Sequence, residues 1–354
     1  MHDNDRQLTM QRWSHLQDQL LPFLEADLGC ITPKLEKLIH TLELTRIEDF
    51  VSSHCAGPGR PPHERGWLAN AFVAKGVLNI PTTRGLIERL ANDRVLRRIC
   101  GFSLTKALPS ESCFSRAFAE FAELRLAERV HEALIKHYLG NELIGHICRD
   151  ATAIEAREKP KEPPNQHADS STSKKPRIKR QLEQSLKQAL DEIPVHCNRG
   201  TKCNAQGYKQ SWNGYKLHID TADCGVPIAA ILSSASFHDS GAAIPLSQIS
   251  AERVTSLYDV MDAAYCSQDL HEYSRELGHV PLIDHNPRGA EKEAFEPADA
   301  ERYKIRSTVE RTNARLKDEF GGRHVMLQGA QKVYSHLMFG LLVLSADQLM
   351  RVLI

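Results

Sequence analysis

The spacing of apolar side chains divides the chain into a helical first part and a second part of mixed period. Residues 35–42 carry leucine and isoleucine at i, i+3, i+4 and i+7, the spacing that places side chains on one face of a helix. Apolar stretches of helical period follow at 67–78, 82–90 and 109–138, and polar or Gly/Pro-rich breaks separate them. We therefore predict that residues 1–140 form an all-α domain of several short helices.

The period changes at about residue 143, where short apolar runs typical of β-strands begin. Residues 208–232 contain two such runs around a polar turn at 220–225, which predicts a β-hairpin. Helical stretches alternate with the other runs, and this alternation is typical of an α/β domain with an antiparallel portion. The expected strands outside the hairpin are 143–148, 257–261 and 280–284, and the expected helices are 180–191, 242–249 and 267–277.

Residues 303–317 combine one carboxylate with a row of cations. Read as a single helix, this stretch places Arg306, Glu310, Asn313 and Lys317 on one face, because they follow one another at steps of four, three and four residues. One interpretation is a capping box, the Ser-x-x-Glu segment that ends at Glu310, ahead of a solvated basic face. The other is a face that holds a metal ion and a phosphate backbone together. The rest of the chain has to decide between them.

Charge is unevenly distributed although the formal net charge is zero. Residues 157–180 hold eight Lys/Arg against three Asp/Glu, and residues 301–317 hold six against two. Local excess matters for contact with phosphates, because screening limits the reach of a charge to about 10 Å. The segment 157–180 is also rich in Pro and Ser and poor in apolar residues, so we expect a flexible basic loop or insertion there.

Cysteine usage and hydropathy indicate a cytoplasmic protein. The nine cysteines include no C-x2-C pair, and the chain has no apolar segment of a secretory signal, so we expect reduced thiols. Cys197 and Cys203, with His196 and His218, do not have the spacing of a common zinc module. The longest apolar run, residues 337–344, is far shorter than the roughly 20 residues of a membrane span.

Two further carboxylates join Glu310 as candidates for chemistry. Asp150 and Asp262 each follow a short apolar run directly, and the ends of strands are where α/β sheets collect their functional groups. An isolated aspartate in such a place is commonly a turn or cap residue. Three carboxylates that converge repel one another unless cations neutralise them. Hard oxygen ligands select Mg²⁺ or Mn²⁺, and a pair of such ions catalyses in-line attack at phosphodiesters.

The spacing in residues 303–317 resembles that of a known enzyme family. Tyr303, Arg306, Glu310 and Lys317 follow the pattern Y-x2-R-x3-E-x6-K. This pattern resembles the signature of bacterial insertion-sequence transposases of the DDE class.

Other parts of the chain are similar to the same family. Asp150 in Asp-Ala-Thr resembles its first acid, and Asp262 in Asp-Ala-Ala-Tyr resembles its second. The hairpin and the His-Asp-Ser segment at 238–240 resemble its middle region, and residues 60–121 resemble the N-terminal domain common in such transposases. The basic segment 157–180, soon after the first acid, departs from the family pattern.

The resemblance implies an RNase H-like catalytic domain, a mixed sheet flanked by helices, at 141–354, preceded by a helical DNA-binding domain at 1–140. It implies two Mg²⁺ (or Mn²⁺) ions, nicking of the terminal inverted repeats, and transfer of the 3′-hydroxyls into target DNA. The partners would be DNA and at least a second copy of the chain, in a cytoplasmic, nucleoid-associated protein without a membrane span. The implied residues are Asp150, Asp262 and Glu310 as catalytic metal ligands, Tyr303, Arg306, Lys317 and Asn313 as DNA contacts, and His238 and Asp239 as supporting groups.

Two alternatives remain open from the sequence. A transposase-derived protein could bind DNA without catalysis, although none of the three acids is missing here. A nuclease with the same fold could cut DNA without joining it.

Overall fold

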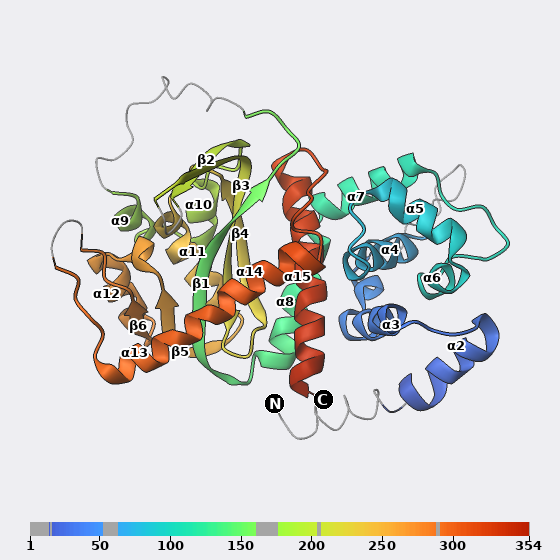
Figure 1. Ribbon diagram of the computed structural model, residues 1–354, viewed down its shortest axis with the longest axis horizontal. Helices are drawn as coiled ribbons and strands as arrows, with labels where there is room; N and C mark the ends of the chain where they lie inside the picture. The colour runs from blue at the N-terminus through green and yellow to red at the C-terminus, as the bar shows by residue number, and fades with distance from the viewer. Residues whose placement is uncertain are drawn as a thin grey trace. The chain divides into compact units, whose positions relative to one another are not determined.

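The computed structural model describes residues 14, 16–51, 63–160, 176–203, 207–287 and 291–353. The chain forms two compact units (Figure 1). One, the helical unit, comprises Met1–Leu134, Arg315–Met326 and Gln331–Ile354. The other, the sheet unit, comprises Ile135–Ala314 and Leu327–Ala330. This division differs from the expected boundary at residue 140, because the C-terminal helix belongs with the N-terminal helices.

The helical unit is built around aromatic side chains from several helices. The ring of Phe72 lies 4.8–6.1 Å from the rings of Phe114, Phe118, Phe121 and Phe339, centroid to centroid. These contacts join α4, α7 and α15, and the all-α expectation for this part of the chain is confirmed. The principal helices are α2 (Leu21–Leu28), α3 (Pro33–Thr45), α4 (Arg65–Val77), α5 (Thr83–Asn92), α6 (Arg94–Ile99), α7 (Glu111–Glu123), α8 (Leu126–Leu139) and α15 (Ala330–Leu353).

The helix α15 is long and apolar enough to cross a membrane by length and composition. Its most apolar window has a mean hydropathy of 1.2, but 83% of that window is buried within the protein. A helix whose apolar surface is already covered by its own chain has the environment of a core helix. Its apolar character therefore reflects packing in the core.

The sheet unit contains a six-stranded mixed sheet. The strands lie in the order β2-β3-β1-β5-β6. The strand β4 also pairs with β3, along residues 215–221, whereas β2 pairs with residues 209–214 of β3. The pairs β1–β5 and β5–β6 are parallel, and the others are antiparallel. The expected hairpin is β3 and β4, and the polar strand β2 was not predicted. The bounds are β1 (Leu143–Glu155), β2 (Asn198–Cys203), β3 (Lys209–Ala222), β4 (Pro227–Ser234), β5 (Thr255–Met261) and β6 (Val280–Ile283).

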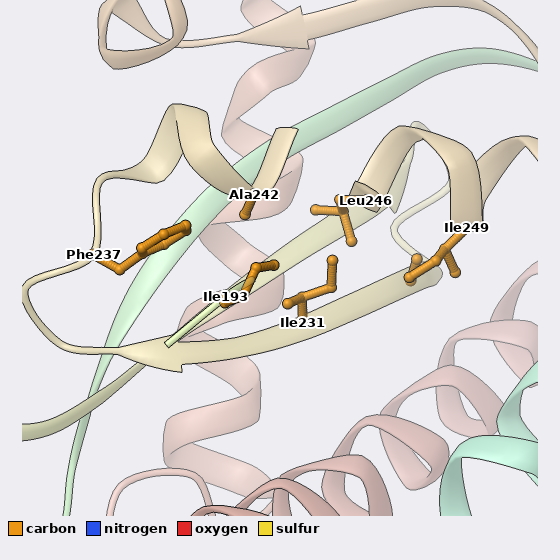
Figure 2. Close-up of a cluster of buried hydrophobic side chains, with 7 residues drawn as sticks. Ile193, Ile231, Phe237, Ala242, Leu246 and Ile249 are labelled. Carbon is orange, nitrogen blue, oxygen red and sulfur yellow. The ribbon is translucent and has the colours of Figure 1, made fainter. Parts of the chain in front are cut away.

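Helices cover both faces of this sheet, as the expected RNase H-like architecture requires. On one face, α11 (Ala243–Ala251) packs on β4, where Leu246 and Ile249 meet Ile231 and Phe237 (Figure 2). On the same face, α12 (Gln268–Glu276) packs beside α11. On the other face, α14 (Ser307–Glu319) lies across the strands (Figure 1). The smaller helices are α9 (Arg177–Gln181), α10 (Leu186–Asp191) and α13 (Pro297–Tyr303).

The basic segment that was expected to be a flexible insertion is described only at its ends. Residues 161–175 lie outside the described residues. At the C-terminal end, the expected helix 180–191 is two short helices, α9 and α10. Ser185 caps α10 through a capping box with Gln188, and this cap starts a second helix just after the first has ended.

A network of polar side chains joins β5, the residue before β6 and α12. His279 Nδ1 lies 3.1 Å from Asp259 Oδ2, and His279 Nε2 lies 3.4 Å from Ser256 Oγ. Ser274 donates a further hydrogen bond to Asp259. Asp259 is buried, so its carboxylate depends on these partners.

This network predicts a pH-dependent contribution to stability. The hydrogen bond that His279 donates to Asp259 raises the pKa of His279, and burial opposes this shift. The charge of Asp259 raises the pKa further, and the more distant charges of Arg149 and Asp220 respectively lower and raise it. Because the folded pKa exceeds the unfolded value of about 6.5, the stabilisation is complete below that value and is lost as the pH rises through the folded pKa. We expect His279→Gln to lower the melting temperature more at pH 6 than at pH 9. A difference that is constant with pH would contradict this assignment.

Candidate active site

The strand β1 carries the first acid in its interior. β1 runs through Asp150 to Glu155, whereas the sequence predicted an end at residue 148. Asp150 is therefore not a residue that follows a strand, and this expectation was wrong. Residues 151–155 pair with Gly214–His218 on β3, and this pairing continues the strand past the polar aspartate.

The register of the parallel strands brings the second acid to the same level. Arg149 on β1 is paired with Met261, the last residue of β5. The next residues along the two strands are Asp150 and Asp262, which therefore lie side by side on neighbouring strands. As expected, Asp262 directly follows its strand, and its side chain accepts a hydrogen bond of 2.9 Å from the backbone N–H of Ala264. Asp262 is therefore both a cap residue of the following 3-10 turn and a neighbour of Asp150.

The third acid lies on α14, which begins later than the sequence suggested. Residues 303–317 are not one helix, because α13 ends at Tyr303 and a 3-10 turn, Lys304–Arg306, precedes α14. Ser307 has helical backbone angles and its hydroxyl accepts from the side chain of Arg311, so it is not the N-cap of a capping box. That interpretation of the stretch was wrong. Glu310 lies in the first turn of α14.

A small apolar cluster fixes α14 on the sheet. Cys148, Val260, Leu282 and Val309 are all buried and pack together. Cys148 is two residues before Asp150, Val260 is two before Asp262, and Val309 immediately precedes Glu310. Side chains two apart on a strand share one face, so the cluster and both aspartates face α14. This apolar packing therefore holds α14 against β1 and β5 and brings the three acids together.

A single guanidinium lies among the three carboxylates. Arg306 Nη1 is 2.6 Å from Glu310 Oε1, and its Nη2 is 3.8 Å from Asp150 Oδ1 and 3.7 Å from Asp262 Oδ2. The Arg306 side chain is 21% exposed. Burial alone would lower the pKa of Arg306, but Tyr303 and the three acids raise it. The arginine is therefore charged and neutralises a cluster of like charges.

Asn313 belongs to this cluster and not to the surface. It is buried, and its Nδ2 donates a 3.0 Å hydrogen bond to Asp150 Oδ2. The alternative of a solvated surface residue does not fit this buried position, and the amide that was expected to contact DNA is hydrogen-bonded to Asp150. Burial raises the pKa of Asp150 to about 6, although Arg306 opposes the shift. The amide of Asn313 orients the carboxylate from the helix side.

Comparisons with known proteins point to the same site. Residues 142–345, more than half of the chain, match the family model described as a transposase DDE domain. The chain belongs to the DDE transposase family. Residues 24–120 match a second model, described as a transposase domain (DUF772). No curated protein and no solved structure matches the chain. The family membership inferred from the sequence is confirmed, and a DDE domain implies a nucleic-acid-cleaving enzyme.

DDE transposases generally use divalent metal ions, and the donor set of this transposase fits such ions. Asp150, Asp262 and Glu310 offer carboxylate oxygens, the ligands that Mg²⁺ prefers. Asn313 Oδ1 is buried and has no hydrogen-bond partner among the described residues, so this oxygen is available to accept from a water or to contact an ion. Within the described part of the chain, no three acidic, His or Cys side chains already form a metal-holding group. The carboxylates surround Arg306 instead.

The other predicted DNA contacts of the transposase lie on the same segment. Tyr303 is half-buried, stacks near Phe295 at a centroid distance of 4.8 Å, and packs on the Cys148 cluster. Burial raises its pKa to about 12, so its hydroxyl stays protonated. Lys317 lies in the last turn of α14, within the helical unit.

The predicted supporting groups have other partners. Asp239 forms an ion pair of 2.8 Å with Lys216 on β3, and His238 Nδ1 lies 2.8 Å from Ser240 Oγ at the start of a 3-10 turn. Among the described residues, the hydrogen bonds and ion pairs of His238 and Asp239 do not include the three acids.

Tyr265, to which the sequence assigned no role, also lies close to the site, because its backbone N–H donates to the carbonyl of Asp262 at 3.0 Å. Its hydroxyl is buried without a hydrogen-bond partner among the described residues. Burial and the charges of Asp239, Asp150 and Asp262 raise the pKa of Tyr265. Its position three residues after Asp262 was the signal in the sequence that could have identified it.

Proposed function

We propose that this transposase binds the terminal inverted repeats of its insertion sequence, nicks the ends and transfers the 3′-hydroxyls into target DNA. The observation that carries the proposal is the convergence of Asp150, Asp262 and Glu310 on the one guanidinium of Arg306. Carboxylates from two strands and a helix have no structural need to meet, since their repulsion destabilises the fold. Such convergence is typical of a site for cations that act on phosphates.

The three acids would hold the ions. When bound there, divalent ions supply an activated hydroxyl nucleophile and stabilise the leaving oxygen of a phosphodiester. Asp150 must lose its proton to serve as a ligand. Burial raises its pKa to about 6, but this value is still below neutral pH, so the carboxyl is mostly ionised there. Asn313 and the apolar cluster keep its carboxylate aimed at the site.

DNA contacts would come from cations next to the acids and from the helical unit. Arg306 and Lys317 are the expected phosphate contacts near the scissile bond, and Tyr303 would stack or form a hydrogen bond beside it. Residues 84–98 contribute five arginines. Two of them are exposed and form ion pairs, Arg84 with the exposed Glu111 and Arg89 with the partly buried Asp93. Exposed pairs of this kind are weak and can exchange for phosphate. Two DNA ends have to be held together, so the active form would contain at least two copies of the chain.

A strand-transfer assay tests the proposal. Purified protein, Mg²⁺, pre-cleaved element ends and a supercoiled target plasmid should yield joined products. Nicked plasmid without joining would instead support a nuclease of the same fold. Retarded DNA with neither product would support a DNA-binding protein without catalysis, and either result would overturn the proposed function.

A further inference from the structure

We propose that Arg306 is an internal cation of the acid cluster and competes with divalent ions for the three carboxylates. This inference rests on the proposed function, since it concerns the same acids. It assigns Arg306 a second role, because the same side chain is expected to reach a DNA phosphate once it leaves the acids. Metal loading would then free the guanidinium for the substrate.

The geometry distinguishes this arrangement from an ordinary helix ion pair. Arg306 and Glu310 are four residues apart, a spacing that alone gives a weak, solvated pair on a helix surface. Here the guanidinium is mostly buried and also lies within 4 Å of Asp150 and Asp262, which belong to other elements. Its charge is thus shared among three carboxylates.

Its hydrogen bonding indicates that the guanidinium can be displaced. Only the contact with Glu310, at 2.6 Å, has the length of a hydrogen bond, whereas the contacts with Asp150 and Asp262 are 3.8 and 3.7 Å. Arg306 Nε is buried without a partner among the described residues. Arg306 therefore interacts with the two aspartates mainly through its charge, and a divalent ion with direct oxygen contacts can replace it.

Competition for the same carboxylates links the position of Arg306 to the affinity for divalent ions. A ligand that must displace a bound group binds more weakly by the free energy of that group's interaction. Removing the Arg306 charge should therefore strengthen divalent-ion binding in the absence of DNA. Arg311 provides a matched control, because it lies five residues further along, on α14, but contacts the hydroxyls of Ser307 and Thr308.

The experiment measures Mn²⁺ affinity of the full chain without DNA, by electron paramagnetic resonance of free Mn²⁺. Arg306→Gln should bind Mn²⁺ about tenfold more tightly than the wild type, and Arg311→Gln should resemble the wild type. Mn²⁺ should also raise the melting temperature of Arg306→Gln by more than that of the wild type. Arg306→Lys keeps the positive charge but cannot reach all three acids, so its Mn²⁺ affinity should lie between those of the wild type and Arg306→Gln. If Arg306→Gln does not fold, Arg306→Lys tests the same expectation.

Two outcomes separate the failure of this inference from the failure of the proposed function. Equal or weaker Mn²⁺ binding by Arg306→Gln, with weakened binding by Asp262→Asn, would overturn the competition and leave the metal site in place. Unchanged Mn²⁺ binding by Asp262→Asn would remove the acids as the metal site and overturn both.

Discussion

Asp262→Asn should abolish DNA cleavage while DNA binding is retained. The substitution keeps the side-chain shape and the capping oxygen that accepts from Ala264, but it removes the negative charge that would hold a divalent ion. We expect cleavage to fall by at least about 10³-fold, equivalent to about 4 kcal/mol of transition-state stabilisation. Plasmid cleavage and gel retardation of element-end DNA, measured on the same preparation, check the two parts. Asp150→Asn and Glu310→Gln should behave alike.

The neighbouring strand offers a matched control. Asp284 directly follows β6 at the same edge of the sheet, but its carboxylate forms an ion pair of 2.9 Å with Lys292. Asp284→Asn therefore removes the same charge from the next strand and should leave most of the cleavage intact. Full cleavage by Asp262→Asn, or equal losses for Asp262→Asn and Asp284→Asn, would show that the acids were assigned wrongly.

Local patterns in the sequence were sufficient for most elements of the fold. The hairpin of β3 and β4 follows from alternating and continuous apolar runs around a turn, and the strands β5 and β6 follow from short apolar runs. Asp262 was placed correctly because the apolar run of β5 ends just before it. These features depend on neighbours in the chain, which the sequence displays directly.

The sequence did not predict the strand segments that depend on pairing with a strand distant in the chain. β2 is polar, and its only described strand partner is β3, so no apolar alternation marks it. β1 continues past Asp150 because β3 pairs with residues 151–155, which the local sequence does not show. The polar aspartate interrupts the apolar run, and the prediction therefore ended the strand too early.

The face of α14 illustrates the same limit at the site. The spacing of Arg306, Glu310 and Asn313 placed them together, and the structure does bring them together. What spacing could not provide was the surface beneath them, the two strands that carry Asp150 and Asp262. Without that surface, Asn313 was taken for a DNA contact and Arg306 for a phosphate contact alone.

Arg149→Met should destabilise the fold strongly, although it lies on the face of β1 opposite the acids. Arg149 and Asp220 are fully buried and form two hydrogen bonds of 2.7 Å, and Ser250 donates a third to Asp220 at 2.6 Å. Loss of the arginine leaves a buried carboxylate without its counter-charge, which typically costs about 3–5 kcal/mol. Urea unfolding followed by circular dichroism measures the change. Because Arg149 pairs with Met261 in the register, we also expect weaker cleavage.

Two further variants separate the pair from the packing around it. Arg149→Met combined with Asp220→Asn removes both charges, so it should recover much of the loss, since a buried pair contributes little net stability compared with neutral groups. Arg302→Met breaks an exposed pair with Asp299 and should change stability by less than about 1 kcal/mol. If Arg149→Met is no more destabilising than Arg302→Met, the buried pair of Arg149 and Asp220 contributes no more to stability than an exposed pair. If the double variant is as unstable as the single one, the arginine acts through its packing, and the register that sets Asp150 beside Asp262 depends on its shape rather than its charge.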